Sequence, residues 1–249
     1  PSENEIAENI KKYNPENIYK ARINILKNIS FILNKEIKDI FNYCSTSKNS
    51  KSRGWRALQN ICLEYLTSEK NSISQDLAYN TYKNSKNMTL KLYSLACICN
   101  MNGKFKNNLL IDFYNKYKTQ PIMIEKWLQI QAAAKVKNNL KNIKKLIKLP
   151  EFSYKNPNQV RSLLNVFARN NSINFHDLSG AGYKFIADQI IILDAINPSS
   201  ASGLSSVFSN WKNLDKDRKS LIKININRIL QKRDLSNNTF EIIDNIIKS

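Results

Sequence analysis

Apolar residues recur every three or four positions along almost the whole chain, which is the spacing of one face of an α-helix. Residues 14–33 illustrate the pattern: Asn14-Pro15-Glu16 places Pro near a helix start, and an apolar stripe follows to Leu33. Pro150 ends another such stretch. The same spacing predicts helices within residues 55–66, 89–99, 109–117, 121–131, 136–147, 160–167, 183–193, 222–230 and 240–247.

The pattern predicts an all-α fold. Turn residues are scarce, with 5 Gly and 6 Pro in 249 residues, whereas all-β folds need a turn about every ten residues. On the order of a dozen helices joined by short polar loops favour a superhelical, solenoid-like array of antiparallel helix hairpins. No strict sequence repeat is visible, so the array would be degenerate. The stretches around Leu95 and Ile191 are apolar on almost every side, which predicts inner-layer helices.

The sequence shows no boundary between domains. No segment is rich enough in Pro, Gly or Ser to act as a linker, so residues 1–249 are expected to form a single domain. The chain has no initiator Met and no signal peptide, and we expect it to be part of a longer protein. Its apolar runs are too short and too interrupted to cross a bilayer, so no membrane partner is expected.

The charge balance is strongly basic, with 39 Lys and Arg against 20 Asp and Glu. An excess of this size can indicate a nucleic-acid or anionic-membrane partner. The chain is also heavy in Lys, Asn and Ile, whose codons are rich in A and T, and phosphate-clamping surfaces tend to favour Arg over Lys. We therefore favour compositional bias and expect no nucleic-acid partner. The alternative is a stand-alone basic helical-repeat scaffold that binds nucleic acid or protein.

Two segments are candidates for a basic surface. Residues 135–148 read as a basic amphipathic helix without acids, which could lie on phosphates, although a solvated outer face of a solenoid is the favoured interpretation. Trp211 is followed by Lys212, Lys216, Arg218 and Lys219. That cluster has too few residues to indicate a nucleic-acid site.

The four cysteines have no metal-binding or disulfide spacing. Cys97 and Cys99 lie two positions apart in a predicted helix, so they point to different faces and cannot act as a C-x-x-C pair. Cys44 and Cys62 are isolated. Buried free thiols in a reducing cytoplasm are the expected state of all four.

His176 is the single histidine, and this excludes several chemistries. No zinc motif with two histidines can be built. The neighbouring Asp177 cannot orient the His176 ring by adjacency alone, so a Ser-His-Asp triad is not indicated. The sequence contains no G-x-S-x-G elbow and no phosphate-binding loop. We therefore expect no catalytic residue, no cofactor and no metal in this chain, and His176 is expected to be a hydrogen-bonded structural residue.

Gly180 and Gly182 flank Ala181 after that histidine. A dinucleotide-binding loop is not indicated, because no strand precedes them and a third glycine is absent. Both glycines are expected to let the backbone turn sharply before a helix that begins at Tyr183.

Arg161 is the candidate binding residue. It follows the helix start Asn156-Pro157-Asn158 and lies beside Leu164 and Ala168 on the predicted helix surface. An Arg so close to an apolar stripe is expected to be partly desolvated. In such surroundings its planar guanidinium group could bind a carboxylate through two hydrogen bonds. A salt bridge to a neighbouring helix and a contact with a substrate are equally compatible with this position.

An ordered series of short motifs extends from one end of the chain to the other. The motifs are PSENE (1–5), NMT (87–89), MIEKWLQIQA (123–132), NPNQVRSLLNVFA (156–168), FH (175–176), GAGYKF (180–185) and NP (197–198). Each motif is weak alone, and the order makes the series specific. Together they resemble the C-terminal helical domain of bacterial aminopeptidase N, a family of gluzincin zinc aminopeptidases.

The resemblance implies a division of labour within a longer enzyme. In that family, a His-Glu-x-x-His helix and a later Glu hold the zinc in upstream catalytic domains, and this chain would be the helical domain that closes over the active site. The implied partners are those N-terminal domains and short peptide substrates, in the cytoplasm, and the chain alone would be inactive. The resemblance places Arg161 in the substrate cavity. A second cavity arginine is replaced by Gly203 here, which puts a two-arginine clamp in doubt.

Overall fold

The computed structural model describes residues 2–46, 48–49 and 51–248, and its regular structure is helical throughout that part of the chain. One isolated bridge joins Tyr13 and Leu214. The all-α, solenoid-like fold class is confirmed. The longer helices are α2 (Pro15–Ile32), α3 (Asn34–Cys44), α4 (Arg53–Leu66), α5 (Ser72–Asn84), α6 (Met88–Cys99), α7 (Phe105–Tyr117), α8 (Pro121–Ala133), α9 (Asn139–Leu146), α13 (Ala181–Asp194), α14 (Pro198–Ser205), α15 (Lys216–Leu230) and α16 (Asn237–Lys248).

Short helices complete the chain. They are α1 (Glu3–Glu8), α10 (Pro157–Val160), the π-helix η1 (Arg161–Asn165), α11 (Val166–Asn170), α12 (Ser172–Phe175) and the 3₁₀ turns η2 (Ser206–Phe208) and η3 (Trp211–Asn213). The segments α10, η1 and α11 follow one another without a break, so they form one helix with a widened turn.

The chain packs into two compact units, and their boundaries fall inside α2 and α8. Unit 1 comprises residues 1–19 and 131–249, and unit 2 comprises residues 20–130. The expectation of a single domain over residues 1–249 stays a prediction.

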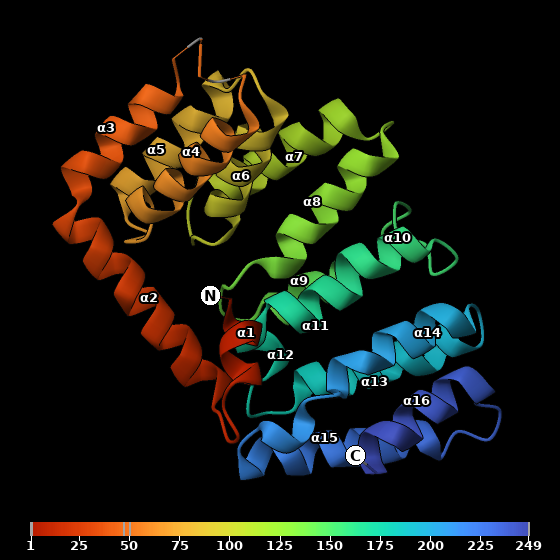
Figure 1. Cartoon of the computed structure of the whole chain (residues 1–249). Coiled ribbons are helices and arrows are strands. Elements are labelled where there is room, and N and C mark those ends of the chain that lie inside the picture. Colours follow the sequence, from red (N-terminus) through yellow and green to blue (C-terminus); the bar gives the residue numbers. More distant parts are fainter. Residues whose placement is uncertain (1, 47, 50, 249) are drawn as a thin grey trace. The chain divides into compact units, whose positions relative to one another are not determined.

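Unit 2 consists of helix hairpins. Helix α3 packs against α4 and α5 packs against α6, while α6 also contacts α4 and α7 (Figure 1). Leu63, Leu95, Cys99 and Phe113 are fully buried between these helices. Helix α6 is covered on several sides, in agreement with its apolar sequence.

Unit 1 is layered around α13. This helix packs against α14 and α15, and α16 packs against both of those (Figure 1). Tyr183, Ile186, Ile190 and Leu193 on α13 are fully buried, as the apolar sequence around Ile191 predicts. The helices beside α13 therefore bury most of its apolar surface, although Ile192 is 44% exposed, and this burial stabilises the unit.

The structure shortens the helix expected in one candidate basic segment and buries part of the other. The helix expected over residues 135–148 is confined to Asn139–Leu146, because Asn138 adopts a left-handed backbone conformation at its start. Lys135 lies outside that helix and pairs with Glu3. Arg218 is only 3% exposed and pairs with Asp215, and so it is not part of an open basic cluster.

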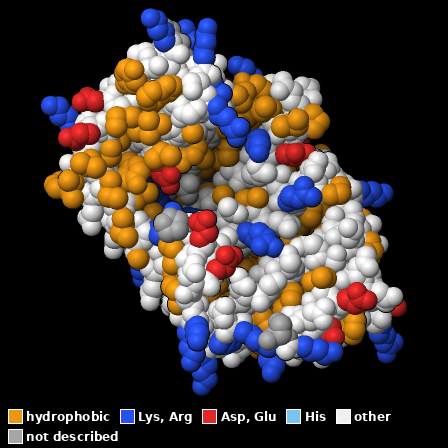
Figure 2. All heavy atoms as spheres, viewed as in Figure 1, with side chains coloured by type: hydrophobic (Ala, Val, Ile, Leu, Met, Phe, Trp, Pro, Cys, Tyr) orange, Lys and Arg blue, Asp and Glu red, His pale blue; other side chains and the backbone are white. Residues whose placement is uncertain are grey.

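The surface of unit 2 carries an apolar patch where α2 meets α3, and Figure 2 shows hydrophobic side chains gathered there. Phe31 is 86% exposed and Ile32 73% exposed, with Leu33 also open to solvent. No helix in the described part of the chain is long and apolar enough to cross a membrane. All four cysteines are buried free thiols, as their spacing predicts.

Candidate functional site

Arg161 stands at the start of a π-helical turn. The chain enters this helix at Asn156, whose side-chain Oδ1 accepts hydrogen bonds from the amides of Asn158 (3.0 Å) and Gln159 (3.4 Å). Pro157 takes the first helical position, where its missing N–H costs nothing. The π-helix η1 then begins at Arg161. Turns of this kind occur frequently at functional sites, because the extra residue redirects the side chains around it.

The π-turn separates a buried face from an exposed one. Leu163, Leu164 and Phe167 are fully buried, whereas Arg161 is exposed. Its Nη1 donates to Asn158 Oδ1 at 3.4 Å. Partial desolvation of Arg161 was therefore a wrong expectation, because the side chain lies open to solvent in this chain. Arg161 forms no salt bridge within the described ranges, and contact with a substrate stays a prediction.

His176 belongs to a network that fixes the start of α15. Its Nδ1 lies 2.8 Å from the Tyr183 hydroxyl. The Nε of Arg218 donates to the His176 carbonyl at 2.7 Å, and Arg218 Nη1 lies 2.6 Å from Asp215 Oδ2. Asp215 Oδ1 also caps α15 by accepting from the Arg218 amide at 3.1 Å. These bonds fasten the loop after α12 to α13 and α15.

The surroundings of His176 keep its ring neutral. Burial, followed by the positive charge of Arg218, lowers the pKa of His176 from 6.5 to about 3, and the opposing effect of Asp215 is smaller. A group with so low a pKa is a weak base near neutral pH, where general bases work best with a pKa near 7. The environment of His176 thus suits a structural role.

We expect the free energy of unfolding to fall as the pH is lowered from about 6.5 to about 4.5. The unfolded chain binds a proton at His176 in this range, whereas the folded chain does so only near pH 3, so protonation favours unfolding. The contribution of His176 to this fall in the free energy of unfolding approaches about 1.4 kcal/mol per pH unit. Urea unfolding at several pH values, on the native chain and on His176→Gln, measures this slope.

His176→Gln is the matched control, because His176 is the only histidine and no other imidazole titrates in this window. The pKa values of Asp177, Asp194 and Asp215 are also lowered, because the hydrogen bonds that each carboxylate accepts outweigh the effect of burial, so these groups add the same slope to both proteins as the pH nears 4. Equal slopes in both proteins would contradict the assignment to His176.

Gly180 and Gly182 have different roles. Gly180 has a φ of +70° and precedes α13, so it provides the left-handed conformation that glycine adopts without strain. Helix α13 begins at Ala181, two residues earlier than expected, and Gly182 lies inside its first turn. A Cβ on Gly182 would come within 2.4 Å of the Phe175 carbonyl oxygen. Gly182 therefore allows α12 and α13 to approach each other closely.

A buried amide network holds the segment between α8 and α9, and sequence reasoning did not find it. Asn171 Nδ2 donates to the carbonyls of Ala132 and Ala134, each at 2.9 Å. Asn174 Nδ2 donates to Asn171 Oδ1 at 2.8 Å, and Asn174 Oδ1 accepts from the Asn139 amide at 2.9 Å. In a chain so rich in Asn, nothing in the sequence distinguishes these two from the others.

The polar groups of unit 1 also line a small cavity of about 210 Å³. Glu8, Arg169 and His176 are among its lining residues, and Arg169 Nη2 donates to Ser206 Oγ at 2.8 Å. Within the described ranges, no three His, Cys, Asp or Glu side chains gather as metal ligands would. The residues present do not fit a zinc ion, which takes several N, S or O ligands at once.

The fold and these sites define an all-helical repeat domain. The chain belongs to the family described as "Domain of unknown function (DUF3458_C) ARM repeats", whose model matches residues 1–248.

Its curated relatives are aminopeptidases, and they match 97–100% of the chain. Aminopeptidase N of Haemophilus influenzae is 30% identical over 100% of this chain and 29% of its own length. Aminopeptidase N of Caulobacter vibrioides is 28% identical over 97% of this chain and 28% of its own length. The crystal structure of Legionella pneumophila aminopeptidase A in complex with aspartic acid is 26% identical, with a TM-score of 0.90, over 100% of this chain and 30% of that chain. This chain therefore spans less than a third of each relative.

Proposed function

We propose that this chain is the C-terminal, non-catalytic domain of a zinc-dependent aminopeptidase that removes N-terminal amino acids from peptides. The proposal rests on one observation: a match to aminopeptidase N that extends along the entire chain and occupies only 29% of the relative. Most of the relative's length, with room for a catalytic centre, has no counterpart in this chain. Zinc would be held in that part, because the described residues gather no metal-ligand cluster.

The apolar patch at the junction of α2 and α3 supports a partner within the same polypeptide. Adjacent exposed apolar side chains such as Phe31 and Ile32 can mark a surface that another part of a protein covers. The upstream catalytic domains are the partner that this proposal assigns to the domain. Four free cysteines are compatible with the reducing cytoplasm as its compartment.

The direct test compares the chain with the intact protein from which it derives. Hydrolysis of alanyl-p-nitroanilide is expected from the intact protein after zinc loading, and none from the chain alone. An intact protein that is inactive on aminoacyl amides and on peptides would overturn the proposal. The alternative of a nucleic-acid scaffold predicts oligonucleotide binding that weakens steeply with salt.

Arg161→Ala in the intact protein is expected to raise the KM for tetrapeptides roughly fivefold, through loss of one charged contact with the distal carboxylate. The KM for alanyl-p-nitroanilide should not change, because that substrate has no distal end. Steady-state kinetics with both substrates measure the difference.

Arg233→Ala is the matched control, because Arg233 is an exposed arginine in the loop between α15 and α16. It should leave both KM values unchanged. Equal effects of Arg161→Ala on both substrates would exclude a contact with the distal end of the peptide.

A further inference from the structure

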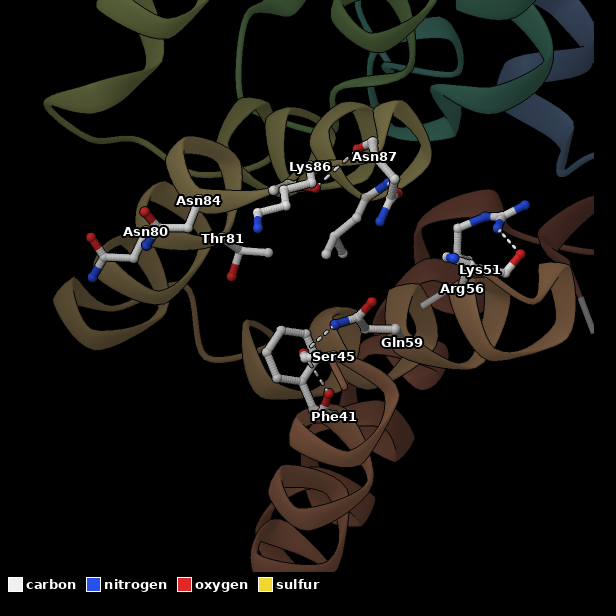
Figure 3. Close-up of a pocket in the computed structure, with 12 residues that line it drawn as sticks. Phe41, Ser45, Lys51, Arg56, Gln59, Asn80, Thr81, Asn84, Lys86 and Asn87 are labelled. Carbon is white, nitrogen blue, oxygen red and sulfur yellow. Dashed lines mark hydrogen bonds between the residues drawn. The ribbon is translucent and has the colours of Figure 1, made fainter. Parts of the chain in front are cut away.

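Unit 2 contains a pocket of about 860 Å³ between its two helix hairpins. One side is formed by α3 and α4, and the other by α5, α6 and the loop that joins them (Figure 3). A pocket of this size is near the upper end of the range for small-molecule sites and is large enough for several amino-acid residues. Phe41 and Leu90 give it an apolar part, and its other lining residues are polar.

The pocket is electropositive. Lys51, Arg56 and Lys86 line it, and no Asp or Glu is among its lining residues. Lys86 forms no hydrogen bond or ion pair with the described residues, and Figure 3 shows its side chain directed toward the space between the hairpins. Helices α4 and α6 both begin beside the pocket, and neither has an acidic residue in its first turn. Their positive helix ends therefore add to the charge of the side chains.

Gln59 supplies a hydrogen-bond acceptor whose orientation is fixed. The Ser45 hydroxyl donates its single proton to the Phe41 carbonyl at 3.0 Å. Ser45 Oγ must therefore accept from Gln59 Nε2, which lies 2.6 Å away. This leaves Gln59 Oε1 as the free end of the amide, without a hydrogen bond to the part of the chain that the structure describes. Gln59 as a whole is only 2% exposed, but its Oε1 reaches the pocket, where a ligand with an N–H group could donate to it.

Asn80 and Asn84 extend the amide lining along α5. They lie one helical turn apart and both line the pocket. An amide side chain presents a donor and an acceptor together, as a peptide group does. A phosphodiester, or a phosphate group without a proton, offers only acceptors and would make no use of Gln59 Oε1. The mixture of amides and cations thus favours a ligand that carries both N–H groups and negative charge.

We propose that this pocket binds an extended peptide segment with carboxylate side chains. Its backbone would pair with Gln59, Asn80 and Asn84, its carboxylates with Lys86 and the cations beside it, and an apolar side chain would lie on Phe41. The net charge of +19 would speed the approach of an acidic partner. The inference is independent of the peptidase function proposed above.

The probe is a fluorescein-labelled hexapeptide of alternating Glu and Ala with blocked ends, and binding to the full chain is followed by fluorescence anisotropy. The same peptide with Gln in place of Glu is the charge control. We expect saturable binding of the Glu peptide and at least tenfold weaker binding of the Gln peptide, because each carboxylate contact is charge-assisted.

Two variants connect the binding to this pocket. Lys86→Gln should weaken binding of the Glu peptide roughly tenfold. Lys118→Gln removes the same charge from an exposed lysine of unit 2 outside the pocket, and it should change affinity less than twofold. Gln59→Met keeps the side-chain length and removes the acceptor, and we expect a fivefold loss once circular dichroism has shown native helicity.

Three results would overturn the inference. The Glu peptide could fail to saturate below about 1 mM, which is weaker than a specific site of this size requires. Lys86→Gln and Lys118→Gln could weaken binding equally, which would indicate a general charge effect. Tripolyphosphate or oligothymidylate could bind more tightly than the peptide and lose affinity in Lys86→Gln, which would make the pocket a phosphate site.

Discussion

Replacing Asn171 by Ala is expected to lower the free energy of unfolding by about 3–4 kcal/mol. The Asn171 side chain is fully buried, and it is the donor to two carbonyls, those of Ala132 and Ala134. Its Oδ1 accepts from Asn174. The substitution leaves two buried carbonyl oxygens without this donor, and an unsatisfied buried group costs about 1–3 kcal/mol. Urea unfolding followed by circular dichroism at 222 nm measures the loss.

Asn170→Ala is the control for this prediction. Asn170 is the exposed neighbour of Asn171, at the end of α11. Removal of a solvated amide should change the free energy of unfolding by less than about 0.5 kcal/mol. A loss below about 1 kcal/mol for Asn171→Ala would mean that the segment between α8 and α9 can reach other hydrogen-bond partners.

The contrast between Asn170 and Asn171 shows what the sequence could not predict. Helical periodicity identifies buried apolar positions, because one face of each helix must be apolar. It says nothing about which Asn is buried, since the side chain has the same polarity in both places. The abundance of Asn in this chain was attributed to codon composition, although Asn171, Asn174 and the pocket residues Asn80 and Asn84 have specific surroundings.

Only part of the structure around Arg161 could be predicted from the sequence. The helix start at Asn156 was predicted correctly, because Asn before Pro is a common cap and first-turn pair. The π-turn at Arg161 could not be predicted, because one widened turn leaves the apolar spacing almost unchanged. Nor does the apolar spacing say how open to solvent an Arg beside an apolar stripe is. The exposure of Arg161 was therefore assigned wrongly while its helix was assigned correctly.

The two basic segments also show that the sequence alone does not reveal which charged residues lie on the surface. Arg218 and Trp211 look like part of an aromatic and basic surface in sequence, yet both are buried. Asp215 pairs with Arg218, and Trp211 Nε1 donates to the Ile246 carbonyl at 2.8 Å. The pairing of Arg218 with Asp215 depends on the local cap of α15, and the bond of Trp211 to Ile246 depends on tertiary packing. A count of charged residues in the sequence detects neither. Net charge consequently indicates a class of partner, whereas the binding surface has to come from the fold.

The second large effect is expected at Gly182, where Ala should lower the free energy of unfolding by about 3 kcal/mol or more. A Cβ there would lie 2.4 Å from the Phe175 carbonyl oxygen and 2.7 Å from that of Asn174. Both are backbone atoms, so no side-chain rotation can relieve the overlap, and α12 would have to move away from α13. The movement would also disturb the contact between His176 and Tyr183. Thermal and urea unfolding of Gly182→Ala measure the effect.

Gly203→Ala is the control, and its expected sign is opposite. Gly203 is exposed within α14, and nothing lies within 4 Å of a Cβ placed on it. Ala has a higher helix propensity than Gly and restricts the unfolded chain more, so a gain of about 0.5–1 kcal/mol is expected. Similar losses in both variants would indicate that glycine is needed for flexibility in general. A loss at Gly182 together with a gain at Gly203 would locate the requirement in the close approach of α12 and α13.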